Sequence, residues 1–178
     1  MRLPGALLVI ALPLGSAGSA LACDLPAAGA DRLALKTVKP VTGDEARFTS
    51  GFGLRKHPLL QVQKLHAGID WAAPHGTPVI AAAAGRIIEA EPRGEYGNVI
   101  LIDHGGGWHT LYGQLSRFAT IRLGDCVAAG AEIAYVGSTG LSSGPHLHFE
   151  VKHNGKHLDP MIFRSPIEPE PKEFEDKG

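Results

Sequence analysis

Apolar and polar residues alternate along residues 144–151, the stretch GPHLHFEV. Successive side chains of a β-strand point to opposite faces, so this pattern predicts a strand with one buried face. The residues expected to face the core are Leu147, Phe149 and Val151. Those expected on the opposite face are His146, His148 and Glu150. Two imidazoles on one strand face can converge on a single metal ion, whereas an isolated His-x-His pair more often only faces solvent.

A second alternating stretch, KLHAGIDW, covers residues 64–71. Its apolar positions are Leu65, Ala67, Ile69 and Trp71, and the positions between them are His66, Gly68 and Asp70. A glycine inside the stretch and Pro74 soon after it argue against a helix. We therefore expect one strand on which the side-chain-free Gly68 leaves room for an ion between His66 and Asp70.

Further strands are expected at regular intervals, separated by turn residues. The candidates are residues 46–54, 78–91 (broken at Gly85, with helix as an alternative), 98–103, 108–115, a segment through Val127, and 133–136. Residues 98–115 read as a hairpin, and Asn154-Gly155 is a strong two-residue hairpin signal. The chain is expected to be all-β, with mostly antiparallel sheets in a single domain.

The N-terminus reads as a secretory signal. Residues 1–22 contain one basic residue, a short apolar run and an A-x-A-like site before Cys23. The run is too short and too interrupted for a membrane span, which needs about 20 apolar residues. We expect a leader at 23–45, the domain at 46–164, and a disordered acidic, Pro-rich tail at 165–178.

Removing the signal leaves 156 of the 178 residues and changes the formal charge from −1 to −2, because Arg2 is lost. This length fits one domain with a sizeable core. The charge gives no indication of a nucleic-acid partner or of an anionic membrane surface. The mature chain is also expected to have no transmembrane segment.

Cys23 and Cys126 are the only cysteines. An even number in an exported chain predicts a disulfide. The alternatives are a lipid-modified Cys23, which would make the chain a membrane-anchored lipoprotein, or two free thiols. A disulfide together with a signal peptide suits the periplasm, with an extracellular location as the alternative.

His66, Asp70 and His148 form a set of two histidines and one carboxylate. Catalytic zinc sites take three protein ligands of this kind and keep a fourth position for water. Bound zinc lowers the pKa of that water to about 7 and polarises the substrate carbonyl. His146, on the face of His148, is predicted to act as general base.

Several sequence blocks resemble the lysostaphin-like (LytM-domain) peptidoglycan metallopeptidases. In chain order they are SGFGLRKHP, HAGIDWAAPHGTPV, YGN, IDHG, TLY, VGSTGLSSGPHLHFEV and LDP. The resemblance runs from about residue 47 to 163. It implies one Zn²⁺ per chain on His66, Asp70 and His148, with His146 catalytic, in a groove of an antiparallel β-fold of the duplicated-hybrid-motif type. It also implies cleavage of peptidoglycan stem or cross-bridge peptides. Glycyl bridges and D-Ala–diaminopimelate links are both substrates within the family.

One position departs from the family pattern. The family usually has a second catalytic histidine in Tyr-x-His-Leu, whereas this chain has Gln114. Glutamine can donate a hydrogen bond to a developing oxyanion but cannot carry a proton. His109 is five residues earlier and is expected to face the other way. The alternative function is therefore a zinc-retaining cell-wall-binding module or a regulator of a partner hydrolase. Arg55, Tyr112 and Asn98 are candidate substrate contacts.

Overall fold

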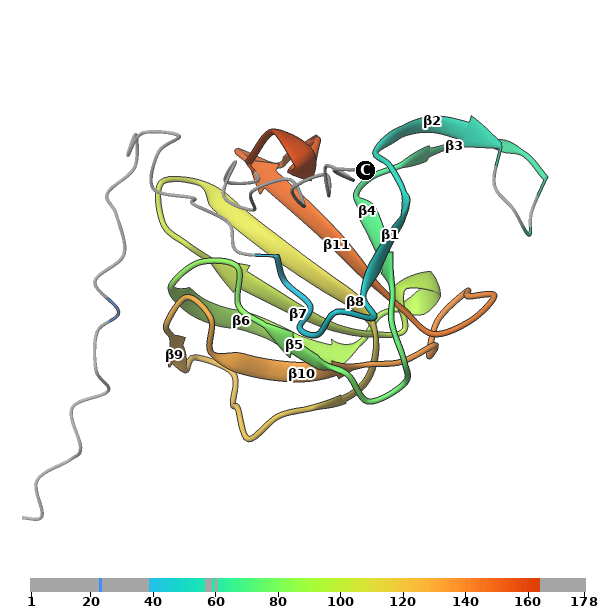
Figure 1. Cartoon of the computed structure of the whole chain (residues 1–178). Coiled ribbons are helices and arrows are strands. Elements are labelled where there is room, and N and C mark those ends of the chain that lie inside the picture. The colour runs from blue at the N-terminus through green and yellow to red at the C-terminus, as the bar shows by residue number, and fades with distance from the viewer. Residues whose placement is uncertain (1–22, 24–38, 57–58, 60, 164–178) are drawn as a thin grey trace, which may run out of the picture.

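The computed structural model describes Cys23 and residues 39–56, 59 and 61–163 (Figure 1). The predicted signal (1–22), most of the leader and the acidic tail (165–178) lie outside the described residues. Within the described part of the chain, no helix is long and apolar enough to cross a membrane.

The structure confirms an all-β fold built from antiparallel strands. The strands are β1 (Arg47–Ser50), β2 (Gly53–Lys56), β3 (Gln63–His66), β4 (Ile69–Ala72), β5 (Pro78–Ile80), β6 (Gly85–Pro92), β7 (Asn98–Asp103), β8 (Trp108–Phe118), β9 (Cys126–Val127), β10 (Glu132–Val136), β11 (His146–His153) and β12 (Lys156–Leu158). Two short 3₁₀ turns are η2 (Gly94–Tyr96) and η3 (Pro160–Phe163). Ten strands form one sheet, in which β1, β4, β11, β8, β7, β6 and β9 are neighbours in that order. Strands β2 and β3 form a separate two-stranded sheet that projects from the main body (Figure 1).

Strand β11 has the predicted two-sided pattern. Its core-facing residues Leu147, Phe149 and Val151 are at most 2 % exposed. They pack in one continuous core with residues such as Tyr112 and Ile100 from β8 and β7. Strand β11 pairs with β4 on one side and with β8 on the other, so both of its edges are hydrogen-bonded. A strand held on both edges fixes the direction of its side chains.

The prediction of one strand over residues 64–71 is wrong. The stretch divides into the end of β3 and β4, with Ala67 and Gly68 between them. A Cβ built on Gly68 would lie 2.2 Å from the Phe149 carbonyl oxygen. The glycine therefore allows the chain to pass against the backbone of β11 where it leaves one sheet for the other. It does not serve to leave room for an ion.

The predicted hairpins are confirmed. Strands β7 and β8 pair antiparallel around the 104–107 turn, and β8 continues to Phe118, beyond the predicted end at 115. Strands β11 and β12 are joined through Asn154 and Gly155, both with positive φ, as a tight two-residue turn requires. The alanine-rich stretch after β5 is not helical, and β6 begins at Gly85.

The packed domain begins before the predicted boundary at residue 46. Val41 is 1 % exposed and forms a bridge with Val79, so part of the expected leader belongs to the core. Cys23 forms the predicted disulfide with Cys126 on β9, with the two Cα atoms 5.6 Å apart. The bond ties the expected mature N-terminus to the edge of the main sheet.

Candidate metal centre

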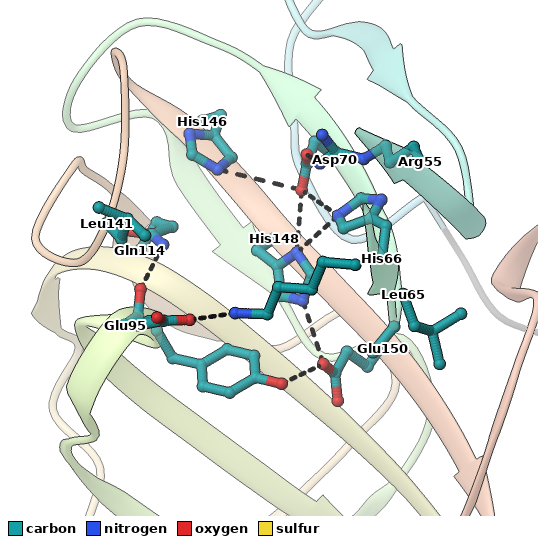
Figure 2. Close-up of a pocket in the computed structure, with 13 residues that line it drawn as sticks. Arg55, Leu65, His66, Asp70, Glu95, Gln114, Leu141, His146, His148 and Glu150 are labelled. Atoms are coloured by element: carbon teal, nitrogen blue, oxygen red, sulfur yellow. Dashed lines mark hydrogen bonds and ion pairs between the residues drawn. The ribbon is translucent and has the colours of Figure 1, made fainter. Parts of the chain in front are cut away.

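His66 and Asp70 are four residues apart, and they converge with His148, 78 residues beyond Asp70, in one groove (Figure 2). Asp70 Oδ1 lies 2.9 Å from His148 Nδ1 and 3.2 Å from His66 Nε2. The two ring nitrogens are 3.2 Å from each other. Within the described residues, these three form the group of His, Cys, Asp or Glu side chains that could hold a metal ion.

Two different structural units present these residues. Asp70 on β4 and His148 on β11 are directly opposite each other in the antiparallel register. His66 is the last residue of β3 and enters from the small two-stranded sheet. Its ring is held by Gly51, whose carbonyl oxygen lies 2.6 Å from His66 Nδ1.

The hydrogen-bond partners assign the protons on both rings. A carbonyl oxygen can only accept, so His66 Nδ1 donates to Gly51 and its Nε2 carries the lone pair. His148 Nε2 lies 3.1 Å from Glu150 Oε1 and donates to this carboxylate, so its Nδ1 also presents a lone pair. When both rings are neutral, two lone pairs and a carboxylate oxygen of Asp70 therefore face one another, an arrangement that favours a cation between them.

The spacing also fits a small metal ion. Ligand atoms 2.0–2.1 Å from a tetrahedral zinc are about 3.3 Å apart, and the three atoms here are 2.9–3.2 Å apart. Two histidines and one carboxylate form a ligand set used by catalytic zinc sites, with one position left for water. The residues therefore fit zinc.

The carboxylates on both sides of His148 favour positive charge at this centre. Burial disfavours a charged His148, but the carboxylates of Asp70 and Glu150 on its two sides raise its pKa to about 9. Burial likewise opposes ionisation of Asp70, but its close contacts with His148 and His66 lower its pKa.

Glu150 is a component of the site that the sequence patterns did not single out. It is fully buried on the same face of β11 as His148. Its Oε1 accepts hydrogen bonds from Tyr96 (2.8 Å) and His148, and Lys152 Nζ lies 3.0 Å from its Oε2. Burial alone would raise the pKa of Glu150, but its contacts with His148 lower it to about 2, so the carboxylate stays charged. Its position two residues after His148 was the available signal.

His146 lies beside the three converging residues, with Nε2 3.9 Å from Asp70 Oδ1. Its Nδ1 is 2.9 Å from the Gly144 carbonyl oxygen and 3.3 Å from Ser142 Oγ. A proton on Nδ1 satisfies Gly144, so Nε2 faces the centre with its lone pair. A neutral imidazole in this orientation can accept a proton from a group at the centre.

Gln114 lines the groove, but its side-chain amide is hydrogen-bonded to two backbone groups. It is 5 % exposed and has φ of +63°, an unusual backbone conformation for a side chain of this size. Its Nε2 donates to the Glu95 carbonyl oxygen (3.0 Å), and its Oε1 accepts from the Gly140 N–H (2.8 Å). Gln114 thereby joins two loops that border the groove. His109 lies at the Asp103 end of the β7–β8 hairpin, 3.9 Å from that carboxylate, as expected for a residue outside the site.

Of the three residues predicted to contact substrate, Arg55 lines the groove, whereas Tyr112 and Asn98 do not. Arg55 lines the groove, with a guanidinium nitrogen 3.6 Å from Asp70 Oδ2. Tyr112 was placed wrongly: it is fully buried, and its hydroxyl accepts the Ala82 N–H (2.8 Å) inside the core. Asn98 does not line the groove, and its amide donates to the Leu115 carbonyl oxygen (3.0 Å).

His104 belongs to the core rather than to the site. Its Nδ1 lies 2.7 Å from the Ala84 carbonyl oxygen, and its Nε2 lies 2.8 Å from Thr110 Oγ1. Thr110 in turn contacts the Tyr112 hydroxyl at 3.1 Å. Burial lowers the pKa of His104, which matches a neutral ring that donates to Ala84 and accepts from Thr110.

Comparison with known proteins identifies the family. Residues 64–160 match peptidase family M23. The DD-carboxypeptidase/endopeptidase Mpg of Neisseria meningitidis serogroup B is 48 % identical over 120 residues, 67 % of this chain. That match covers 27 % of the relative, so the chain spans about a quarter of its length.

Solved structures agree with this result. A zinc-containing peptidase from Vibrio cholerae is 36 % identical with a TM-score of 0.64, over 68 % of this chain and 38 % of that protein. The catalytic domain of lysostaphin from Staphylococcus simulans is 34 % identical with a TM-score of 0.60, over 66 % and 91 % respectively. The fold, the converging His and Asp residues and these similarities lead to one conclusion: the chain belongs to peptidase family M23.

Proposed function

We propose that the protein is an exported zinc metalloendopeptidase that hydrolyses peptide bonds in peptidoglycan stem or cross-bridge peptides. The observation that carries this proposal is the convergence of two histidine lone pairs and a carboxylate oxygen in an open groove. Membership of the M23 family and similarity to a relative named as a DD-carboxypeptidase/endopeptidase support the substrate class.

His66, Asp70 and His148 would hold one zinc ion. When bound, zinc supplies a Lewis acid that polarises the substrate carbonyl and lowers the pKa of a coordinated water. Gly51 and Glu150 keep both imidazoles in the tautomer that presents a lone pair. Such partners of metal-ligating histidines orient the rings and raise their basicity.

His146 acts as general base. Its Nε2 faces the centre, while Gly144 fixes the proton on Nδ1. It accepts a proton from the attacking water and returns it to the leaving amine, since one imidazole can perform both transfers in sequence.

Gln114 replaces the second catalytic histidine of related sequences. One N–H of its amide donates to the Glu95 carbonyl oxygen. The second N–H of the same nitrogen can donate to the carbonyl oxygen of a bound substrate. Gln114→His is expected to raise turnover, because a positioned proton-transfer group contributes about 10²–10⁴-fold in rate. Unchanged turnover would show that one imidazole and the amide suffice.

Digestion of purified peptidoglycan tests the activity directly. The zinc-loaded chain should release fragments with new peptide ends, identified by mass spectrometry. Asp70→Ala should release none because it loses a metal ligand. His146→Ala should keep its zinc and lose cleavage.

The structure of the Gln114 site also supports a second candidate function, a zinc-retaining cell-wall-binding module or a regulator of a partner hydrolase. The Gln114 amide already serves two backbone groups, as expected of a residue kept to hold loops together. Stoichiometric zinc with no new peptide ends would favour this candidate over the peptidase.

We place the protein in the periplasm. The apolar N-terminal segment before Cys23 and the Cys23–Cys126 disulfide both suit an exported chain in an oxidising compartment. Fractionation of cells, followed by mass measurement of the mature chain without reductant, tests this placement. A chain retained in the cytoplasm, or one carrying a lipid on Cys23, would contradict it.

A further inference from the structure

Tyr96 is the last residue of η2 and lines the groove beside His148. Its ring centroid is 5.5 Å from that of His148. On β8, the residue directly opposite His148 is Gly113. A Cβ built on Gly113 would lie 3.5 Å from the Tyr96 ring and 3.6 Å from the His148 Cβ. Tyr96 therefore occupies the space that a larger side chain at this position of β8 would fill.

The Tyr96 hydroxyl holds the carboxylate that orients His148. An ionised carboxylate only accepts, so the hydroxyl donates to Glu150 Oε1 at 2.8 Å. The same oxygen lies 3.1 Å from His148 Nε2, and the other oxygen of Glu150 lies 3.0 Å from Lys152 Nζ. With partners on both oxygens, the carboxylate keeps one orientation. That orientation in turn keeps the proton of His148 on Nε2 and the ring in place.

The loop that carries Tyr96 is fixed by Gln114. The Gln114 amide donates to the carbonyl oxygen of Glu95 at 3.0 Å (Figure 2). This carbonyl belongs to the peptide group that joins Glu95 to Tyr96. The Leu141 N–H donates to the same oxygen at 2.8 Å. A Cβ built on Gly140 would lie 2.2 Å from it, so the two loops are in direct backbone contact. These contacts leave the peptide before Tyr96 little freedom to move.

We propose that Tyr96 is a positioning residue for the metal ligand His148, and that Gln114 acts through it. This inference rests on the metal-binding part of the proposed function. The path runs from the Gln114 amide to the peptide before Tyr96, and from the Tyr96 hydroxyl through Glu150 to the ligand. At the position where related sequences carry a second catalytic histidine, this chain thus uses an amide to hold the support of the metal ligand.

Zinc competition titrations on the full chain test the role of Tyr96 without turnover. Tyr96→Phe removes only the hydroxyl and should weaken zinc binding about tenfold, the lower end of the loss expected for an outer partner. Tyr135→Phe is the matched control, because it removes a hydroxyl bonded to the Glu132 carboxylate outside the groove. Visible absorption of the cobalt-loaded chain, which reports the geometry around the metal, should change for Tyr96→Phe alone. Zinc affinity and cobalt absorption equal to those of the wild type would overturn this role.

A double-variant cycle tests the link to Gln114. Gln114→Asn suits the positive φ of this position and shortens the side chain by one methylene. It should lose the contact with Glu95 and weaken zinc binding, although less than Tyr96→Phe does. If Gln114 acts through Tyr96, the double variant should match Tyr96→Phe alone. Losses that add would contradict the link. Urea denaturation in chelator shows that each variant is folded.

Zinc affinity separates this inference from the peptidase function. A wild-type chain that binds zinc without cleaving peptidoglycan would contradict only the peptidase function, and Tyr96→Phe would still show the tenfold loss. A wild-type chain that binds no zinc would overturn the metal centre and this inference together. In a chain that cleaves, Tyr96→Phe saturated with zinc should have a lower kcat and an unchanged KM, because the change acts on the metal ligand rather than on substrate contacts.

Discussion

The two halves of the metal centre are built in different ways. The sheet half comprises Asp70 on β4 and His148 on β11, in adjacent strands of the ten-stranded sheet above the core. The hairpin half comprises His66 at the end of β3, in a two-stranded sheet whose side chains are largely exposed. The sheet half is held by core packing, and the hairpin half by the Gly51 contact and the chain passage at Gly68. Local stability therefore differs between two ligands of the same ion.

Removing a histidine from each half should show this difference most strongly. Both His148→Ala and His66→Ala should weaken zinc binding by more than about 100-fold, since losses of outer partners alone cost 10–100-fold. In chelator, His148→Ala should also lower the free energy of unfolding by about 3 kcal/mol, because it leaves the buried Glu150 charge without its imidazole. His66→Ala should lower it by about 1 kcal/mol, the size of one hydrogen bond. Zinc competition titrations and urea denaturation measure the two effects, and equal losses of stability would contradict the comparison.

Gly68 joins the two halves, so Gly68→Ala should affect both. The added Cβ would meet the backbone oxygen of Phe149 at 2.2 Å, which no rotamer change can relieve. We expect a loss of about 1–3 kcal/mol in the free energy of unfolding, as for other overpacked sites, and weaker zinc binding because His66 shifts. Gly51→Ala is the control for an added methyl group, since it keeps the backbone carbonyl that contacts His66 and its Cβ would make an ordinary 3.7 Å contact with Phe48. If the two variants matched in stability and zinc affinity, the close approach at Gly68 would not matter.

Glu150→Gln tests the support of the sheet half alone. The buried carboxylate fixes the proton of His148 on Nε2, and its neutral replacement should weaken zinc binding about 10–100-fold. Nitrogen chemical shifts of the His148 ring in chelator should then show loss of the single tautomer. Glu91→Gln, an exposed change on β6, should alter neither measurement.

The smallest expected effect concerns pH and His104, a buried histidine at the turn between β7 and β8. Burial lowers the folded-state pKa of His104 below its ordinary value of 6.5, so the unfolded chain binds a proton more readily. Stability from a neutral His104 is complete above pH 6.5 and falls as the pH drops toward the folded-state pKa, by about 1.4 kcal/mol per unit of pKa difference. Urea denaturation in chelator between pH 6.5 and 5.5 should show a shallower loss for His104→Gln than for the wild type. Identical slopes for the wild type and His104→Gln would contradict this role for His104.

Alternation predicted the fold and the sheet half of the site because these strands are continuous and lie over a single core. Leu147, Phe149 and Val151 face the core as the period of two requires, and His148 therefore faces Asp70. The same rule failed at residues 64–71 because the pattern records which residues are apolar and not where the chain changes sheets. The Gly68 bend depends on a backbone contact with Phe149, 81 residues away, which no local pattern contains.

The roles of buried polar residues were the least predictable. Tyr112 and Glu150 both lie on regular strands, yet the first bonds to the core backbone and the second supports a metal ligand. Gln114 was recognised by its departure from the family pattern, but its two backbone partners come from loops remote in sequence. Hydrogen bonds of this kind depend on tertiary contacts and therefore produce no periodic pattern in the sequence.

The most direct test of the central claim is X-ray absorption at the zinc edge of the purified protein. The structure predicts one zinc per chain, with two imidazole nitrogens and oxygen ligands at about 2.0–2.2 Å. The imidazole contribution should fall in a His66→Ala sample loaded with the same zinc. A spectrum without histidine scattering, or one with sulfur ligands, would contradict a centre built from His66, Asp70 and His148.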